Sequence, residues 1–192
     1  MRVIAGTLRS RTLQAPAGLS TRPTSDRLRE TLFNVLTPQI ARARFLDLYA
    51  GSGAVGIEAL SRGATQVTFV ERAPTALKIL RKNLFQLDLR SGFQIQPGSV
   101  DAYLQRARPE VGFDVVFLDP PYEDEREYDG TLGLLGRTEC ALLATGAVVI
   151  AEHSKKRKPR GRYGALRRTR LLEQGDAALS FYCAEPHDEA AG

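Results

Sequence analysis

The chain has 192 residues, of which 43% are hydrophobic, and this suits one globular domain with a substantial core rather than two full domains. No apolar run approaches the roughly 20 residues that span a bilayer, and the N-terminus lacks a secretory pattern, so we expect a cytoplasmic protein. The chain has two cysteines far apart in the sequence and only two histidines, so no metal-binding cluster is predicted from their spacing. The net charge is +5, and its distribution along the chain is more informative than its sum.

The first 22 residues are expected to form a small extension that precedes the main domain. Arg2 to Gln14 alternates apolar and polar residues around a turn, which predicts a β-hairpin whose arginines face solvent. A helix should follow, because residues 23–26 offer N-cap chemistry, and Pro38 is expected to end it. Its apolar stripe consists of Leu28, Leu32, Phe33 and Leu36.

From residue 44 onward the expected strands and helices alternate, which indicates a doubly wound α/β fold. Strands are expected at residues 44–49, 66–70, 93–96, 113–118 and 147–152, with helices at 52–62, 74–87, 99–107 and 128–143. Two further strands, 166–173 and 178–184, flank a hairpin turn at residues 174–176, so the last strand should be antiparallel. The sequence therefore predicts a mostly parallel seven-stranded sheet over residues 23–185, followed by a flexible tail at 186–192.

Charge is distributed very unevenly along the chain. Residues 1–44 carry a net charge of +6 and residues 153–170 one of +9, whereas residues 45–152 and 171–192 each carry −5. Two basic segments beside an acidic body are expected where a protein binds nucleic acid phosphates. A solvated charge run is the ordinary alternative, and it has weight for the Pro- and Gly-containing stretch after residue 154. The candidate RNA-binding residues are Arg2, Arg9, Arg11, Arg22, Thr24, Arg27, Lys155, Lys156, Arg157 and Lys158.

The stretch from Asp47 to Gly53 predicts a cofactor turn between a strand and a helix. Its glycines allow the backbone to approach a ligand at the positive end of the helix, and Glu71, at the end of the next strand, suits a ribose diol. With Gly56 the turn also satisfies the G-x-G-x-x-G fingerprint, which does not separate NAD from S-adenosylmethionine. Asp47 favours S-adenosylmethionine, which carries an ammonium group. In a purely structural alternative the glycines only pack the helix against the strand. This would explain Gly56 but not the presence of both Asp47 and Glu71.

The motif Asp119-Pro120-Pro121-Tyr122 directly follows the apolar strand at residues 113–118. It predicts methyl transfer to a planar exocyclic amine, whose delocalised lone pair is a poor nucleophile until acceptors engage its hydrogens. The Asp119 carboxylate and the Pro120 carbonyl can each accept one N–H, two prolines stiffen the loop, and the Tyr122 ring can stack on a base. The ordinary alternative is that the motif is a turn that ends a strand. Its position favours a catalytic role, because open α/β folds bind their ligands at the carboxyl ends of the strands. The expected catalytic residues are Asp119, Pro120, Pro121 and Tyr122.

The blocks Arg22 to Asn34, Phe45 to Ala64 and Asp119 to Tyr122 together resemble the RsmD family of bacterial 16S rRNA guanine-N2 methyltransferases. The resemblance covers nearly the whole chain, and the first block is its family-specific part. It implies a class I methyltransferase fold with an N-terminal hairpin, S-adenosylmethionine as cofactor, and methylation of the N2 amine of one guanine in 16S rRNA. The expected partner is that RNA within a small-subunit assembly particle, with no membrane, no metal and a monomeric enzyme.

The same resemblance implies which residues hold the cofactor. Asp47 and the turn at residues 49–53 would hold the methionine part, and Glu71 the ribose hydroxyls. Ser99 stands where many relatives have Asp or Asn, so Ser99 and Asp101 both remain candidates for the adenine contact. The expected cofactor-binding residues are Asp47, Tyr49, Ala50, Gly51, Ser52, Gly53, Glu71, Arg72, Ser99 and Val100.

Other functions remain open at this stage. A DNA or RNA adenine-N6 methyltransferase shares the Asp-Pro-Pro-Tyr loop, although there is no room for a separate DNA-reading domain between the cofactor turn and Asp119. A protein glutamine methyltransferase fits the amide chemistry but leaves the basic segments unexplained. The chain could also be a non-catalytic RNA-binding assembly factor, which would not bind S-adenosylmethionine in a calorimetric titration. An NAD-dependent oxidoreductase is a further alternative, and titration with NADH would test it.

Overall fold

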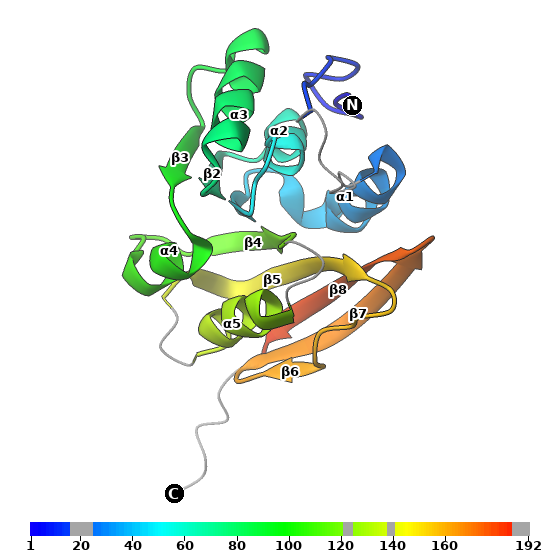
Figure 1. The fold of residues 1–192 in the computed structure, drawn as a ribbon, viewed down its shortest axis with the longest axis vertical. Helices are drawn as coiled ribbons and strands as arrows, with labels where there is room; N and C mark the ends of the chain where they lie inside the picture. Colours follow the sequence, from blue (N-terminus) through cyan, green and yellow to red (C-terminus); the bar gives the residue numbers. More distant parts are fainter. Residues whose placement is uncertain (16–24, 121–124, 138–140, 186–192) are drawn as a thin grey trace, which may run out of the picture.

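Helices and strands alternate along the computed structural model, which describes residues 1–15, 25–120, 125–137 and 141–185 (Figure 1). The helices are α1 (Asp26–Ile40), α2 (Ala54–Ser61), α3 (Pro74–Gln86), α4 (Val100–Arg106) and α5 (Glu125–Leu135). The strands are β1 (Arg44–Leu48), β2 (Gln66–Glu71), β3 (Phe93–Pro97), β4 (Phe113–Leu118), β5 (Leu143–Ser154), β6 (Arg162–Tyr163), β7 (Leu166–Gln174) and β8 (Ala177–Ala184). Of the described helices, none has the length and apolar content that crossing a bilayer would need.

One sheet contains all of these strands, in the order β3-β2-β1-β4-β5-β8-β7-β6. Neighbours from β3 to β5 are parallel, and β8 is antiparallel to both β5 and β7, so the predicted sheet class is confirmed. The two-residue strand β6 is an addition that the sequence did not predict. Chain order reverses between β1 and β4, and open α/β sheets bind ligands at the carboxyl ends of strands at such a point.

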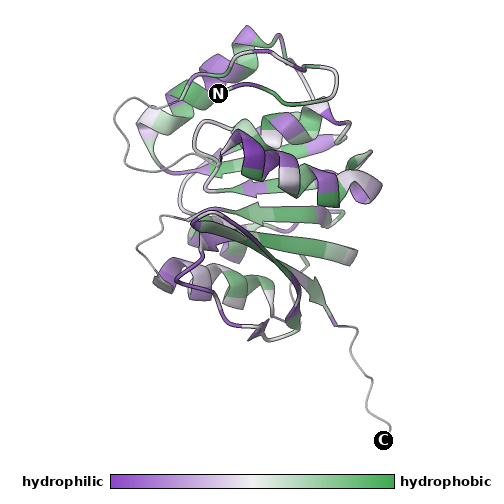
Figure 2. Ribbon diagram, turned by 90° about the vertical axis from the view of Figure 1, so that its right-hand side faces the viewer, coloured by the Kyte–Doolittle hydropathy of each residue, from purple (hydrophilic) through white to green (hydrophobic). Residues whose placement is uncertain are grey.

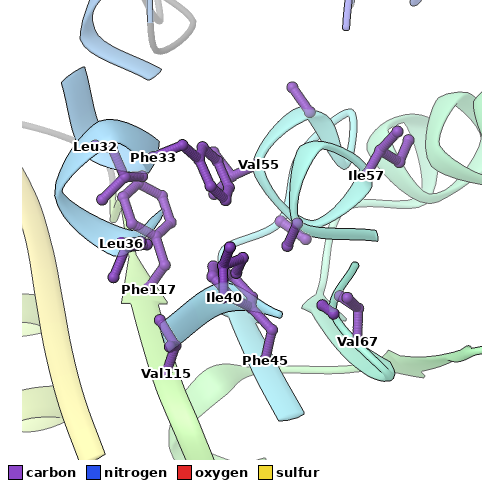
Figure 3. Close-up of a cluster of buried hydrophobic side chains, with 14 of the residues drawn as sticks. Leu32, Phe33, Leu36, Ile40, Phe45, Val55, Ile57, Val67, Val115 and Phe117 are labelled. Carbon is purple, nitrogen blue, oxygen red and sulfur yellow. The ribbon is translucent and has the colours of Figure 1, made fainter. Parts of the chain in front are cut away.

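The two faces of the sheet are covered by different helices. Strand residues alternate between the faces, so Phe45 and Phe117 join one core with α1, α2 and α3, while Leu48 and Leu118 join the other with α4 and α5. Figure 3 shows the first of these cores, in which Phe33 from α1 lies near strand residues of β1 and β4. Hydrophobic colour runs along the central strands in Figure 2, as expected for strands buried on both faces.

The largest differences from the predicted helix boundaries are at the ends of α1 and α5. Ser25 caps α1 as expected, accepting a hydrogen bond from Leu28 N at 3.1 Å, but the helix runs through Pro38 to Ile40. Proline is tolerated in this last turn because Ile40 is buried and holds the helix end against the core. Helix α5 ends at Leu135, eight residues earlier than predicted, and β5 already begins at Leu143.

The N-terminal extension is closed by one antiparallel bridge, between Arg2 and Thr12, rather than by two regular strands. Val3 N donates to Arg11 O at 2.9 Å and Ser10 N donates back to Val3 O, so the segment has hairpin pairing around a wide loop. Its apolar residues Val3 and Leu13 enter the core beside α1, α2 and α3. The extension is therefore packed as part of the domain.

Candidate functional site

Strands β1 and β4 bring the two predicted motifs to one edge of the sheet. They pair in parallel with Leu48 opposite Leu118, so the turn after β1 and Asp119 after β4 start from adjacent strand ends. This edge lies where the chain order reverses, which is the usual ligand crevice of the fold. The structure thus joins motifs that are about seventy residues apart in sequence.

The turn after β1 has a backbone that few side chains tolerate. Tyr49, Gly51 and Gly53 have φ angles of 60°, 56° and 79°, and a Cβ on Gly53 would lie 2.3 Å from a methyl group of Leu80. A Cβ on Gly51 would meet nothing closer than 3.9 Å, so this glycine leaves open space in front of the turn. Gly56 packs against Phe69, as the helix-packing explanation requires. The turn is a preformed cradle that ends at the N-terminus of α2.

Asp47 lies at the bottom of this cradle and is 2% exposed. Its Oδ2 accepts a hydrogen bond from Gly56 N at 2.9 Å, so the carboxyl group fixes the first turn of α2. Burial raises the pKa of Asp47 to about 8, the bond from Gly56 opposes that rise, and the nearby charge of Glu71 adds to it. Asp47 therefore has a structural role that its sequence motif did not reveal. Its contact with a cofactor ammonium group remains a prediction.

Glu71 closes the other side of the cradle. Its Oε2 accepts from Gly51 N at 2.8 Å and its Oε1 accepts from Ala73 N at 2.7 Å, so both acids thought to need a cofactor already bind backbone N–H groups. A carboxylate has about four acceptor positions, which leaves capacity for a ribose hydroxyl. Arg72, in contrast, is exposed and forms an ion pair at 3.5 Å with Glu127 of α5.

A hydroxyl network connects the cradle to α5. Tyr49 donates its hydroxyl to Glu127 Oε2 at 2.7 Å and lies 2.7 Å from Thr131 Oγ1. Burial holds the pKa of Tyr49 well above its ordinary value, so the phenol stays neutral and acts as a donor. This network fixes the cradle relative to α5, the helix that follows the Asp-Pro-Pro-Tyr motif in the sequence.

The adenine candidates lie at the start of α4. Ser99 is the N-cap, with its Oγ accepting from Ala102 N at 3.3 Å, and Val100 is buried beneath it. Asp101 is exposed, and both of its carboxylate oxygens accept from the Gln105 amide within the same helix. A Cβ on Gly98, just before the cap, would meet no other atom within 4 Å, so space is open there.

Asp119 emerges from β4 beside a second carboxyl group. Leu118 is opposite Ala151 in the β4–β5 pair, so the next residues, Asp119 and Glu152, lie side by side, and Glu152 is 1% exposed. The pKa of Asp119 is raised well above its ordinary value, first by burial and then by the charges of Glu152 and Asp47. Sequence reasoning missed Glu152, although an acid at the end of a predicted strand was the signal available. Pro120 is buried, while Pro121 and Tyr122 lie outside the described residues.

The N-terminal RNA candidates are mostly on the surface. Arg2, Arg9, Arg11 and Arg27 are all exposed, and Arg11 Nη2 donates to Gln86 O on α3 at 3.2 Å. Arg22 and Thr24 lie outside the described residues. The exposed arginines on the extension and on α1 are compatible with a phosphate-binding surface.

The second basic segment is more neutralised than its sequence suggested. Lys155 and Lys158 both form ion pairs with Glu173, at 3.0 and 2.8 Å, which joins the predicted +9 segment to the acidic segment after it. Arg160 pairs with Asp129, and Arg162 and Arg167 both pair with Glu185. Lys156 and Arg157 are exposed. The fold thus places acids beside several of these bases, and RNA binding by Lys155, Lys156, Arg157 and Lys158 stays a prediction.

Metal binding finds no support in the part of the chain that the structure describes. There, no three His, Cys, Asp or Glu side chains are grouped so that they could hold an ion. The acidic side chains of the crevice instead bind backbone N–H groups, as Asp47 and Glu71 do.

Comparison with known proteins identifies the family. The model of the family described as Conserved hypothetical protein 95 matches residues 1–183. The Bacillus subtilis protein named "Putative rRNA methyltransferase YlbH" is 38% identical over 183 residues, covering 95% of this chain and 98% of that protein. Ribosomal RNA small subunit methyltransferase D of Haemophilus influenzae is 46% identical over 124 residues, 64% of each chain.

A solved structure agrees with this assignment. The Escherichia coli protein described as "Putative methyltransferase yhhF" superimposes with a TM-score of 0.82 at 35% identity, covering 96% of this chain and 98% of that one. The fold expected for a class I methyltransferase is thereby confirmed. The chain belongs to the Conserved hypothetical protein 95 family, which is the RsmD methyltransferase family that its sequence motifs resemble.

Proposed function

We propose that this protein transfers a methyl group from S-adenosylmethionine to the exocyclic N2 amine of a guanine in 16S rRNA. The observation that supports it most is the adjacency of the cradle after β1 and Asp119 after β4, at paired strand ends. A methyl donor held by the cradle and an amine held by Asp119 would be close to each other. The names of the relatives, which are rRNA methyltransferases, support RNA as the substrate class.

The cradle fits the expected cofactor. The open space in front of Gly51 and Gly98 is room that a side chain would fill, and the start of α2 offers a positive helix end to a carboxylate. In the proposed arrangement Asp47 and the turn at residues 49–53 hold the methionine part, and Glu71 the ribose. When bound, S-adenosylmethionine supplies an electrophilic methyl group on a positively charged sulfur.

Asp119 would act on the amine that receives this methyl group. Its carboxylate and the Pro120 carbonyl accept the two N2 hydrogens, which orients the nitrogen lone pair for in-line attack. Formation of the N2–CH3 bond with breakage of the S–CH3 bond would move the positive charge from sulfur to N2 and leave S-adenosylhomocysteine neutral at sulfur. The Asp119 carboxylate would stabilise the charge on N2 and accept the departing N2 proton.

Substitution of Asp119 tests this role. Asp119→Ala should nearly abolish methylation of small-subunit particles, while calorimetry should show S-adenosylhomocysteine binding close to that of the wild type. Asp119→Asn keeps an acceptor and should lose less activity than Asp119→Ala. Methylation at the wild-type rate by the alanine variant would show that the proposed corner is not catalytic.

The RNA part of the proposal has its own test. Phosphate contacts by arginines such as Arg9 and Arg27 release counterions, so methylation at subsaturating substrate should weaken steeply with added salt. The target guanine must leave any stacked duplex to reach Asp119, so free duplex RNA should be a poor substrate. A rate that does not respond to salt would contradict phosphate contacts as the source of affinity.

A further inference from the structure

A cavity lies away from the proposed methyl-transfer corner. It has a volume of about 740 Å³ and opens beside α4, over the starts of β1, β2 and β4 and along β3. None of the expected cofactor residues and neither Asp119 nor Glu152 lines it. We call it the α4 trough, and nothing in the proposed reaction at Asp119 uses it.

The floor of the α4 trough is polar where the rest of that sheet face is apolar. On the same face, Leu46, Leu48 and Val70 pack into the core under α4 and α5. The trough instead presents a square of four side chains on two paired strands, which are Gln66, Thr68, Gln94 and Gln96. Thr68 is only 3% exposed and Gln66 and Gln96 are partly buried, whereas Gln94 is exposed, so the floor is sheltered at β2 and open to solvent at β3. Amide side chains arranged in this way can pair with the edge of a nucleobase.

Three arginines surround this floor. Arg106 Nε donates to Ala102 O at 3.0 Å, and Arg108 Nη1 donates to Gln105 O and Ala107 O at 3.0 and 2.8 Å, so both guanidinium groups are held by the carboxyl end of α4. Arg44 lies over the Phe113 ring, 5.9 Å from its centroid, and its Nε is buried without a hydrogen-bond partner among the described residues.

The guanidinium groups of these arginines have no ion-pair partner among the residues that the structure describes. Within the described parts of the chain, Arg44, Arg106 and Arg108 form no ion pair with a carboxylate, whereas five basic side chains of the 155–167 region do. The nearby Asp114 carboxylate accepts a hydrogen bond from the backbone N of Arg44 at 2.7 Å. Glu110 is the one acid among the lining residues. The trough therefore combines oriented guanidinium groups, which suit phosphate, with amides and the Tyr103 ring, which suit a base.

We propose that the α4 trough binds a single-stranded nucleotide of the RNA substrate, separate from the guanine that is methylated. The arginines contact its phosphates, Gln66, Gln94 and Gln96 contact its base edge, and Tyr103 lies against its ring. This inference rests on the proposed function only in taking RNA as the substrate. A solvated strand face would account for the glutamines, but not for three arginines around them that form no ion pair with the described residues.

The test measures RNA binding without requiring methylation. The probe is a fluorescein-labelled single-stranded RNA of mixed sequence, titrated by anisotropy with the full chain saturated with S-adenosylhomocysteine. Arg106→Ala/Arg108→Ala removes two exposed charges from the trough. The matched control is Arg81→Ala/Lys82→Ala, which removes two exposed charges from α3 on the other side of the sheet. Melting curves establish that each variant is folded.

We expect the trough pair to lower the slope of log affinity against log salt by about 1.4, since each lost single-strand phosphate contact removes about 0.7. The control pair should leave that slope almost unchanged. Gln94→Ala/Gln96→Ala should weaken binding about fivefold or more with the wild-type salt slope, because it removes base contacts and no charge.

Three results would overturn the proposal. Equal losses in the trough and control pairs would indicate general surface charge. Unchanged RNA affinity with weaker binding to small-subunit particles would assign the trough to a protein partner. Wild-type RNA affinity in both trough variants would leave the trough without a role in RNA binding. If the trough variants lose RNA binding as expected but the protein does not methylate guanine N2, the proposed function would be contradicted and the role of the trough would stand.

Discussion

Replacement of Glu58 should destabilise the protein strongly, although this residue is far from the proposed catalytic corner in sequence. Glu58 of α2 is 0% exposed, and its carboxylate accepts from Ile4 N at 2.8 Å, Ala5 N at 3.0 Å and Arg62 Nε at 2.7 Å. It also lies 3.7 Å from Arg29 Nε, which belongs to a side chain that is fully buried. One carboxylate thus holds the N-terminal extension, α1 and α2 together.

The size of the effect follows from what Glu58→Ala leaves behind. Burial already lowers the pKa of Arg29, against the opposing charges of Asp26 and Glu58, and two of its nitrogens lack hydrogen-bond partners among the described residues. Removing one member of a buried ion pair costs about 3 to 5 kcal/mol. For a domain of this size about 1 kcal/mol corresponds to roughly 2 to 4 °C in melting temperature, so a fall of at least about 6 °C is expected.

Two measurements check the reasoning on Glu58. Calorimetry or circular dichroism gives the melting temperature, and amide hydrogen exchange at Ile4 and Ala5 shows whether the extension has loosened. Arg62→Ala is the control, because it removes a partly exposed partner and leaves the Glu58 carboxylate in place. A fall below about 2 °C, or unchanged exchange at both amides, would refute the claim that this carboxylate anchors the extension.

Three further predictions follow from the acids and amides of the site. The pKa of Asp47 is about 8 in the folded state against an ordinary 3.8, so between these pH values the folded protein retains a proton that the unfolded chain has lost. The stability of the protein should therefore fall as pH rises from about 4 to 8. Asp47→Asn should reduce this dependence of melting temperature on pH, and a curve identical to that of the wild type would contradict the prediction. Because the charge of Glu152 helps to raise the pKa of Asp119, Glu152→Gln should move the acid limb of the methylation rate to lower pH, whereas a limb that stays in place would show the two groups are independent. Asn83 donates a hydrogen bond to Ser52 O at 2.9 Å and so supports the cradle. Loss of this hydrogen bond in Asn83→Ala costs about 1 kcal/mol, which would weaken S-adenosylhomocysteine binding about fivefold if the cost falls on the turn. Wild-type affinity by calorimetry would reject this positioning role.

Local chemistry made the sheet and the motifs predictable from the sequence. The strand at Phe113–Leu118 is predicted with its observed bounds, because a mainly apolar run, interrupted only by Asp114, is followed by the turn-forming Asp-Pro-Pro. The Ser25 cap and the glycine turn after β1 were likewise readable, since capping and positive φ angles depend on residue type. The end of α1 could not be predicted in this way, because burial of Ile40 outweighs the tendency of Pro38 to end a helix.

Contacts between distant segments were the part that sequence patterns did not reveal. Residues 153–170 contain nine basic residues and no acid, and the sequence did not reveal that the β7–β8 hairpin brings Glu173 beside Lys155 and Lys158. Glu152 became a candidate only when the β4–β5 register placed it next to Asp119. Arg29 likewise appeared as one more arginine of a basic segment, although its buried partner Glu58 gives it a structural role.

The identity of the methylated nucleoside tests the central claim most directly. Small-subunit particles from cells that lack this protein would be incubated with it and with S-adenosylmethionine labelled in the methyl group, and the RNA would then be digested to nucleosides. The account predicts label in N2-methylguanosine, lost with Asp119→Ala. Label in N6-methyladenosine, in a carbon-methylated base or in a ribose-methylated nucleoside would contradict it.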